Sequence, residues 1–273
     1  PGHLVAVGSA NNGDASAFDA VAWTSSDSGA TWRRSLVAGA SDAAMRDLAA
    51  TSTGLVAVGV DGHPSGGTQI IGIRGAAVWT SKDGTRWTRV PTQASFGGAH
   101  MDHVVAADSI LVATGLDVPT GSGSVAPPIW RSSDGLTWTR AEPLWATALS
   151  IGADAPIWTG SAFVASGTEI LGSGRYIWTS TDGLGWSVAD VQGASAPSLA
   201  GLAIAGSTIV LAGTPPGGGQ VLIWASSAGL AWQPLQAPAV MEGGAPLRIV
   251  SGPNGLLILN SNTLGATGWL GTH

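Results

Sequence analysis

The sequence predicts an all-β fold, and three observations support this prediction. A phrase with two tryptophans around a polar turn, such as AVWTSKDGTRWTRV from Ala77 to Val90, occurs five times. Short apolar runs rich in Val, Ile, Thr and Trp alternate with Gly, Pro, Asp and Ser along the whole chain, and such runs are typical of strands. No segment shows a sustained period of 3.6 residues, which an amphipathic helix would require.

The phrase returns at a regular spacing, which predicts a repeat architecture. The intervals between successive first tryptophans are 56, 51, 48, 46 and 45 residues, counted over Trp23, Trp79, Trp130, Trp178, Trp224 and a degenerate sixth copy at Trp269. Each interval holds four short runs, and four antiparallel strands in a repeat of this length are typical of a propeller blade. We therefore predict one domain over residues 1–273, a six-bladed β-propeller of four-stranded antiparallel blades. The blades are expected at about 1–40, 41–95, 99–143, 152–192, 197–238 and 245–273.

The two ends of the repeat do not match. With the strands of a blade named A to D from the inside outward, PGHLVAVG aligns with STGLVAVG, so the first blade begins at strand B. The last blade ends after strand C, at ATGWLGTH. Because an unpaired sheet edge invites pairing with another chain, we expect either that the sequence is trimmed at both ends or that a partner covers the open seam.

The tryptophan phrase is the expected C–D hairpin, and it resembles the Asp-box, or BNR, repeat of sialidase-like propellers. That repeat has the pattern Ser-x-Asp-x-Gly-x-Thr-Trp, which the first copy matches in full, while the next three copies are one residue shorter and the fifth has Ala228 in place of the aspartate. An aspartate can accept hydrogen bonds from backbone N–H groups of its own turn, and the following tryptophan can pack under it. We therefore expect a structural role for Asp27, Asp83, Asp134 and Asp182.

The composition excludes several classes of protein. Charged residues make up only 10% of the chain, which argues for a packed rather than a disordered protein. The absence of cysteine excludes disulfides and thiolate metal sites, and one lysine, Lys82, beside ten arginines argues against a nucleic-acid surface. The composition is rich in Gly and Ala and resembles that of exported proteins of high-GC bacteria. We expect an extracytoplasmic protein, secreted, periplasmic or lipid-anchored through a removed N-terminus, without a cofactor or a transmembrane segment in this chain.

Polar residues at the starts of the expected A strands suggest a ligand site at the mouth of a central channel. The candidates are Arg46, Asp47, Asp102, His103, Asp154 and Arg248, with Trp145 as a stacking wall. One interpretation is a polar ligand pocket, and the other is a set of solvated charges that pair with one another. A metal site of His100, Asp102 and His103 has suitable ligand types. Because neighbouring residues of a strand point to opposite faces, we predict no metal.

The resemblance to sialidases raises the question of catalysis. It implies three arginines that hold the substrate carboxylate, a tyrosine nucleophile activated by a glutamate, and an aspartate acid/base. The single tyrosine, Tyr176, lies two residues before Trp178 on an expected C strand, and only Arg46 and Arg248 begin A strands. We therefore predict a non-catalytic binding scaffold for a partner protein or a glycan. The alternative is a glycoside hydrolase or lyase of sialidase-like fold with a non-standard site, which would need a carboxylate pair such as Asp102 and Asp154.

Overall fold

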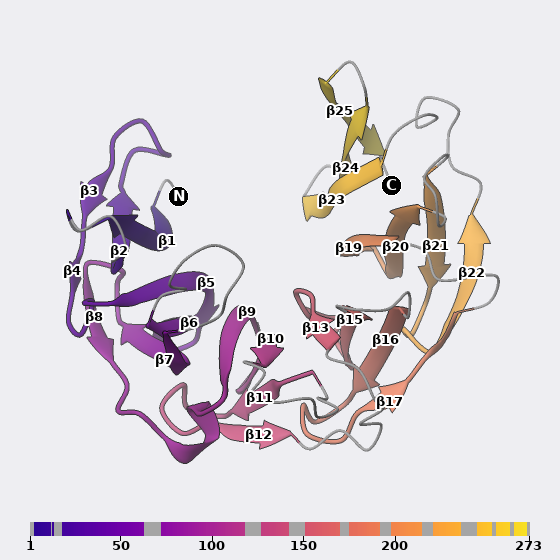
Figure 1. Ribbon diagram of the computed structural model, residues 1–273. Helices are drawn as coiled ribbons and strands as arrows, with labels where there is room; N and C mark the ends of the chain where they lie inside the picture. The colour runs from indigo at the N-terminus through magenta and orange to yellow at the C-terminus, as the bar shows by residue number, and fades with distance from the viewer. Residues whose placement is uncertain are drawn as a thin grey trace. The chain divides into compact units, whose positions relative to one another are not determined.

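The computed structural model shows an all-β chain, as the sequence predicts, with one short 3₁₀ helix, η1 (Ala94–Phe96), in the part that it describes. The described residues are 3–11, 13, 18–62, 72–117, 127–141, 151–169, 175–191, 198–214, 221–235, 245–252, 255–262 and 265–271. None of the helical structure in these ranges is long and apolar enough to span a membrane. The chain divides into two compact units, Pro1–Ala148 and Leu149–His273 (Figure 1). A single domain over the whole chain stays a prediction.

The first unit contains three sheets in its described part. In spatial order, sheet 1 is β1-β2-β3, sheet 2 is β4-β8-β7-β6-β5, and sheet 3 is β12-β11-β10-β9. The strands are β1 (Leu4–Asn11), β2 (Phe18–Ser25), β3 (Arg33–Arg34), β4 (Leu36–Val37), β5 (Ala43–Thr51), β6 (Gly54–Gly62), β7 (Ile73–Ser81), β8 (Arg86–Arg89), β9 (Ala99–Ala107), β10 (Ile110–Asp117), β11 (Ile129–Ser132) and β12 (Thr139–Ala141).

The second unit also contains three sheets in its described part. Sheet 4 is β13-β15-β16-β17 with β14 also on β15, sheet 5 is β18-β22-β21-β20-β19, and sheet 6 is β23-β24-β25. The strands are β13 (Ile151–Ala153), β14 (Ile157–Trp158), β15 (Phe163–Glu169), β16 (Arg175–Ser180), β17 (Ser187–Val188), β18 (Asp190–Val191), β19 (Ser198–Ala205), β20 (Thr208–Thr214), β21 (Leu222–Ser226), β22 (Ala231–Leu235), β23 (Ala245–Gly252), β24 (Gly255–Asn262) and β25 (Gly265–Gly271).

Two sheets contain a strand that the sequence analysis did not predict. The short strands β4 and β18 add to the outer edges of sheets 2 and 5, where they run parallel to β8 and β22. The prediction that all strands in a sheet are antiparallel is therefore wrong at these two edges. The physical reason is that the segment that follows one sheet runs along the outer strand of the next and pairs with backbone groups that would otherwise be exposed.

In sheet 3, side chains take the place of such a strand. The Gln93 amide nitrogen donates to the Leu136 carbonyl at 2.6 Å, and its oxygen accepts from the Trp138 N–H at 3.0 Å. The Ser95 hydroxyl donates to the Trp138 carbonyl at 2.8 Å. The segment before sheet 3 thus covers the edge of that sheet with polar side chains.

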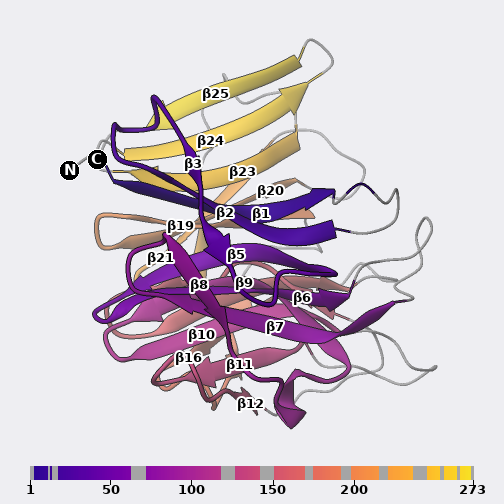
Figure 2. The same cartoon turned by 90° about the vertical axis from the view of Figure 1, so that its left-hand side faces the viewer.

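Within each unit, consecutive sheets pack on one another (Figure 2). In the first unit, the glycine of the C–D turn lies at the contact between sheets. A Cβ atom added to Gly84 would lie 2.7 Å from the Val5 side chain of sheet 1, and one added to Gly135 would lie 2.8 Å from Val56 of sheet 2. Both glycines also have positive φ, at 80° and 73°. The turn therefore needs glycine both for its backbone conformation and for the spacing between sheets.

Candidate functional site

The C–D turns show the hydrogen bonds expected of a structural role. In sheet 2, the Ser81 hydroxyl accepts from the Gly84 N–H at 2.9 Å, and Asp83 Oδ1 accepts from the Thr85 N–H at 2.9 Å. The Trp87 ring N–H donates to the Gly84 carbonyl at 2.9 Å. The carboxylates of Asp27, Asp134 and Asp182 also accept backbone N–H groups of their own turns, at 2.7–2.9 Å.

The turn that lacks an aspartate shows what the carboxylate adds. At Ala228, the Ser226 hydroxyl still accepts from the Gly229 N–H at 2.8 Å, and the Trp232 ring N–H still donates to the Gly229 carbonyl at 2.9 Å. The serine, glycine and tryptophan therefore form the turn without the aspartate. The carboxylates are occupied by their own turns, which makes these residues part of the framework.

Four of the inner strands contain one extra residue at the same point. In β5, Met45 pairs with Gly59 and Asp47 pairs with Val58, so Arg46 has no opposite residue. Such a β-bulge bends the strand and redirects side chains, and bulges are common near binding sites. The extra residues are Arg46 in β5, Asp102 in β9, Ala200 in β19 and Leu247 in β23.

A glycine of strand B faces the inner strand at three of these four bulges, and Asn260 takes its place in sheet 6. A Cβ atom at Gly59 would lie 1.9 Å from the Ala44 carbonyl oxygen, and one at Gly115 would lie 1.8 Å from the His100 carbonyl oxygen. Real Cβ atoms do not approach this closely, so the glycine that ends the LVAVG and LVATG runs allows the inner strand to come near.

Polar side chains gather at the bulges of β5 and β9, and we call Arg46, Asp47, His100, Asp102 and His103 the charged cluster. His100 Nε2 lies 3.2 Å from Asp102 Oδ2, and Arg46 Nε lies 4.0 Å from Asp102 Oδ1. His103 Nδ1 lies 4.0 Å from Asp47 Oδ2. The structure thus brings together Arg46, Asp47, Asp102 and His103, four of the seven residues that the sequence analysis selected.

The members of the cluster differ in how strongly the fold holds them. Asp47 accepts the Leu48 N–H at 2.8 Å and the Val104 N–H at 3.0 Å, so its carboxylate ties β5 to β9. The His100 side chain is only 9% exposed, and its Nδ1 has no hydrogen-bond partner within the described ranges. The Arg46 side chain is 47% exposed and that of His103 is 35% exposed. The Asp47 side chain is 37% exposed and that of Asp102 is 28% exposed, so a partner could reach every member of the cluster except His100.

Asp102 is held in its ionised form. Burial raises the pKa of this carboxyl. The hydrogen bond from His100 and the positive charges of His100, Arg46 and His103 lower the pKa by more than burial raises it, so the net pKa is below the usual range. At neutral pH Asp102 is an acceptor and an anion, which is unsuitable for a group that must donate a proton.

The other predicted site residues belong to the second unit or lie outside the described residues. Asp154 accepts the Ser166 hydroxyl at 2.9 Å and donates its own N–H to the Ser166 carbonyl at 2.7 Å. Arg248 is described only as a residue of β23 that pairs with Leu259. Trp145 lies outside the described residues. One site formed by all seven residues therefore stays a prediction.

A repeated arginine–tryptophan–aspartate contact was missed by the sequence analysis. The Arg89 guanidinium lies over the Trp79 ring, 5.5 Å from its centroid, and Arg140 lies over Trp130 at 5.6 Å. Each arginine also pairs with an aspartate at the end of strand B, Asp61 or Asp117 respectively. The signal was present, because tryptophan and arginine are ten residues apart in both copies, 79 to 89 and 130 to 140.

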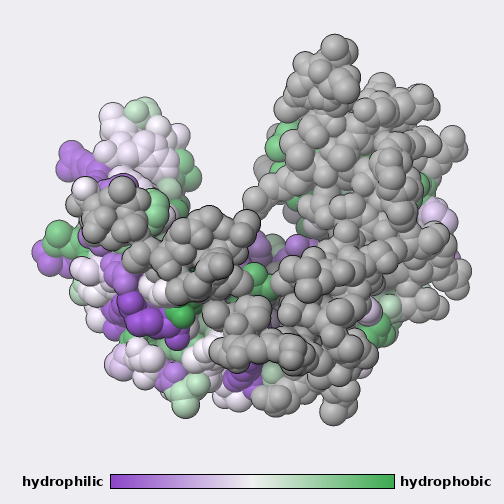
Figure 3. Space-filling model, viewed as in Figure 1, coloured by the Kyte–Doolittle hydropathy of each residue, from purple (hydrophilic) through white to green (hydrophobic). Residues whose placement is uncertain are grey.

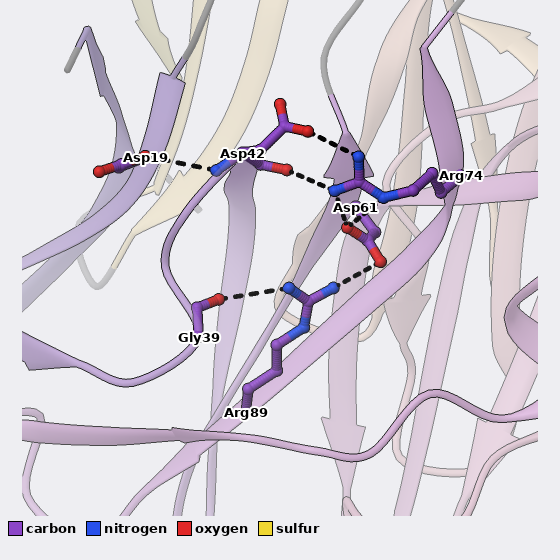
Figure 4. Close-up of polar contacts among 6 residues, drawn as sticks. All are labelled: Asp19, Gly39, Asp42, Asp61, Arg74 and Arg89. Atoms are coloured by element: carbon purple, nitrogen blue, oxygen red, sulfur yellow. Dashed lines mark hydrogen bonds and ion pairs between the residues drawn. The ribbon is translucent and has the colours of Figure 1, made fainter. Parts of the chain in front are cut away.

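In sheet 2 this contact extends into a network of charges (Figure 4). Arg74 donates to Asp42 and to Asp61, both at 2.6 Å, and Arg89 donates to Asp61 at 2.8 Å and to the Gly39 carbonyl at 3.3 Å. Hydrophilic residues lie over this β6–β8 region in the surface view (Figure 3). Because the charges are mutually compensated, the network joins the 39–42 segment to sheet 2 and is not a ligand site.

The residues that the structure describes contain no group of three or more side chains able to hold a metal ion. They do form a cavity of about 500 Å³ at the C–D turn end of sheet 2, and Lys82, Arg86, Asp83 and Asp134 contribute to its wall. A volume of this size can accept a small ligand. The cavity has charges of both signs, and the sequence analysis did not find it because its wall comes from turns of two sheets.

Comparison with known proteins identifies the fold but no relative by sequence. No protein-family model matches the chain, and no curated protein matches it. The structure of YCF48 bound to D1 peptide is similar with a TM-score of 0.57 and 15% identity, over 91% of this chain and 74% of that one. The β-propeller domain of the Trilobed protease from Pyrococcus furiosus, described as having an open velcro topology, is similar with a TM-score of 0.58 and 10% identity, over 98% and 77%.

The chain has a β-propeller-like fold. A third similar structure, the Hadza microbial sialidase Hz136, has a TM-score of 0.56 and 14% identity, and the match covers 99% of this chain but only 63% of the sialidase. Because these proteins differ in function and all three are below 25% identity, the likeness indicates the fold alone.

Proposed function

We propose that this chain is a six-bladed Asp-box β-propeller that acts outside the cytoplasm as a non-catalytic binding module for a partner protein. The observation that supports this function is the charged cluster, in which Arg46 and His103 are partly exposed beside the ionised Asp102. Arginine is enriched among the residues that contribute most to protein interfaces. The spacing of the tryptophan phrases and the Ser-Asp-Gly turns support the Asp-box and six-blade parts of the proposal.

Two observations favour binding over catalysis. A glycoside hydrolase needs one carboxylic acid that stays protonated and a second carboxylate at a defined distance. Asp102 has a lowered pKa, and the Asp47 carboxylate accepts two backbone N–H groups. Neither carboxyl is therefore suited to act as the protonated acid. Tyr176 stacks on Trp178, with 6.0 Å between ring centroids and 10° between planes, which is a packing role rather than that of a nucleophile.

The mixture of charges favours a peptide as the ligand. Arg46 can pair with an acidic side chain and Asp102 with a basic one, so a peptide that contains both signs would satisfy the cluster. One of the similar structures, that of YCF48, contains a bound peptide. The extracytoplasmic location rests on composition alone, and a glycan ligand is the alternative that the experiment must separate.

The test is a selection from a phage-displayed library of random peptides on the wild-type chain. Selected peptides should bind Arg46→Ala and His103→Ala about tenfold more weakly, because each change removes a partly exposed polar side chain of the cluster that the peptide contacts. Arg33→Ala is the matched control, since Arg33 is an exposed arginine of β3 and belongs neither to the cluster nor to the cavity, and it should bind as the wild type does. Equal binding by all four proteins would reject the cluster as the binding surface. Hydrolysis of a polysaccharide or sialoside that is lost in Asp102→Asn would instead establish the enzyme.

A further inference from the structure

The cavity at the C–D turn end of sheet 2 lies where the turn of sheet 3 packs on sheet 2. A Cβ atom at Gly135 of sheet 3 would lie 2.8 Å from Val56, which contributes to the cavity wall. A Cβ atom at Gly54 would lie 2.3 Å from the Ser81 carbonyl oxygen and 3.1 Å from Lys82 Cα. Close packing of these turns therefore fixes the shape of the cavity and the position of the Lys82 backbone.

Two cations of the cavity wall, Lys82 and Arg86, depart from the repeat. In the other four copies of the C–D turn, the position of Lys82 holds Ser26, Ser133, Thr181 or Ser227, and the position of Arg86 holds Thr31, Thr137, Gly185 or Ala231. The hydrogen bonds of the turn come from its serine, aspartate, glycine and tryptophan, so neither cation is needed to form it. Exposed cations are common on proteins, but these two replace small uncharged residues and both line one cavity.

The charged groups of the wall differ in what they already bind. Asp83 Oδ1 accepts the Thr85 N–H at 2.9 Å and the Thr85 hydroxyl at 2.8 Å, and Asp134 Oδ1 accepts two N–H groups of its own turn at 2.7 and 2.8 Å. Within the described ranges, the side chains of Lys82 and Arg86 form no hydrogen bond or ion pair. The cationic donors of the cavity are therefore available to a ligand, while its carboxylates are partly occupied.

The remainder of the wall combines hydroxyl groups with apolar side chains. It includes Thr80 and Thr88, whose hydroxyl groups can both donate and accept hydrogen bonds. It also includes Leu55 and Leu136, and Leu136 is 53% exposed. A second cavity of about 260 Å³ shares part of this wall and adds the hydroxyl-bearing residues Ser52, Ser109 and Ser133. A ligand that fits this wall has hydroxyl groups and an apolar C–H face besides a negative charge.

The balance of charge in the wall favours a ligand with one negative charge. Two cations can hold one carboxylate, the guanidinium through two parallel N–H groups and the ammonium as a further donor. A dianion such as phosphate would gain less, because Asp83 and Asp134 belong to the same wall and repel the second charge. The cavity is therefore better suited to a carboxylate than to a phosphate.

We propose that this cavity binds a sugar acid, a hydroxylated ring that carries one carboxylate. Lys82 and Arg86 hold the carboxylate, the threonine hydroxyls bond to the ring hydroxyls, and the leucines cover the C–H face of the ring. A volume of about 500 Å³ is in the range of small-molecule pockets. The cavity includes Thr51 at the end of β5, whereas the charged cluster lies at the β5 bulge around Arg46, so this proposal does not rest on the function proposed above.

The experiment titrates the isotope-labelled chain with methyl β-glucuronide and follows the backbone amide signals by NMR. The amides of residues 81–88 should shift on binding. Methyl β-glucoside has the same ring without the charge, and acetate has the charge without the ring, so both should bind at least about tenfold more weakly. Absence of glucuronide binding would overturn the proposal. Binding of the glucoside, acetate or inorganic phosphate as tightly as the glucuronide would overturn it as well, because the ligand class would then be different.

Two substitutions use residues that the repeat already accepts. Lys82→Ser and Arg86→Thr introduce the residues that sheet 3 has at these positions, so both variants should fold with an unchanged melting temperature. Each should bind the glucuronide about tenfold more weakly, because a hydrogen bond to a charged group is lost. Arg33→Thr, which removes an exposed arginine of β3 outside the cavity, is the matched control and should bind as the wild type does.

Equal binding of the glucuronide by the wild type, Lys82→Ser and Arg86→Thr would overturn the proposal. A failure of either variant to fold would overturn it too, since the turn itself would then need the cation.

Discussion

Sheets 1 and 2 contain the same turn but not the same environment for it. In both, the ring N–H of the second tryptophan donates to a turn glycine, from Trp32 to Gly29 at 3.1 Å and from Trp87 to Gly84 at 2.9 Å. Trp32 is nevertheless 44% exposed, while Trp87 is 2% exposed. The geometry of the turn is therefore determined by residues of the turn itself, whereas the burial of its tryptophan is determined by residues elsewhere in the chain.

The neighbouring sheet explains the difference. The turn of sheet 2 lies against Val5 and Thr24 of sheet 1, whereas the atoms nearest to a Cβ atom at Gly29 of sheet 1 belong to Leu4 and Trp32 of its own sheet. A repeat sequence therefore specifies a sheet and its turn, and the packed interior of the fold comes from sheet-on-sheet contact. Copies of one motif should then differ in their contribution to stability, and three experiments test this.

The largest difference is expected for the two tryptophans. Trp87→Ala should lower the free energy of unfolding by about 3–5 kcal/mol, because it leaves a cavity in a packed core. Trp32→Ala should cost about 1 kcal/mol, since nearly half of this side chain is already in water. Urea unfolding followed by circular dichroism measures both values. Equal losses would mean that the turn, rather than the sheet interface, determines the stabilisation.

The arginines of the D strands provide the second comparison. Arg89 pairs with Asp61 at 2.8 Å and lies over Trp79, with a side chain only 22% exposed, whereas Arg34 at the same register position in sheet 1 is exposed. Arg89→Ala should therefore cost about 1–3 kcal/mol through the lost hydrogen bonds and ring contact.

The control for this experiment is Arg34→Ala, which should change the free energy of unfolding by no more than about 0.5 kcal/mol. The loss in Arg89→Ala should persist at high salt, because a pair that is partly buried is screened less than one at the surface. A loss that disappears in salt would assign the Arg89 contact to surface electrostatics.

The comparison also shows which parts of the molecule follow from the sequence. The strands and the turn hydrogen bonds depend on residues close together in the chain, such as Ser81, Asp83 and Gly84, and the phrase itself predicts them. The sequence analysis selected Arg46 and Asp102 as residues at the starts of A strands, but it did not predict that both are bulged. The contact of Asp47 with the Val104 N–H could not be predicted, because it joins residues 57 positions apart across two sheets.

The parallel strands β4 and β18 escaped prediction for a different physical reason. Each is two residues long and has no alternating pattern of its own, because it is defined by the unpaired edge that it covers. The Arg89–Trp79 contact, in contrast, was readable as a tryptophan–arginine spacing that recurs in the next repeat. Sequence periodicity therefore predicts which residues face each other across neighbouring strands. It does not predict which sheet edge a connecting segment follows.

The smallest difference is expected between the aspartates of the two turns, and pH measures it. The Thr31 hydroxyl, the Thr31 N–H and the Ser25 hydroxyl donate to Asp27 and lower its pKa to about 2. The pKa of Asp83 is also lowered, but there the backbone N–H of Thr85 contributes most and its hydroxyl second. Because the folded pKa of each carboxyl is below its unfolded value, the stabilisation is present above about pH 4 and is lost as the pH falls through the folded pKa. For Asp27 this window is about pH 4 to 2.

Carboxyl NMR titration of Thr31→Val and Thr85→Val separates the two cases. Valine keeps the backbone N–H and removes the hydroxyl, so Thr31→Val should raise the pKa of Asp27 toward the usual value of 3.8 and leave Asp83 unchanged. Thr85→Val should raise the pKa of Asp83 by a smaller amount, because its main donor is retained. Equal pKa shifts in the two turns would show that the threonine hydroxyl contributes equally to the lowered pKa in both. A larger shift at Asp27 would mean that the extra residue of the first turn changes which donor holds the carboxylate, while the serine, glycine and tryptophan contacts remain the same.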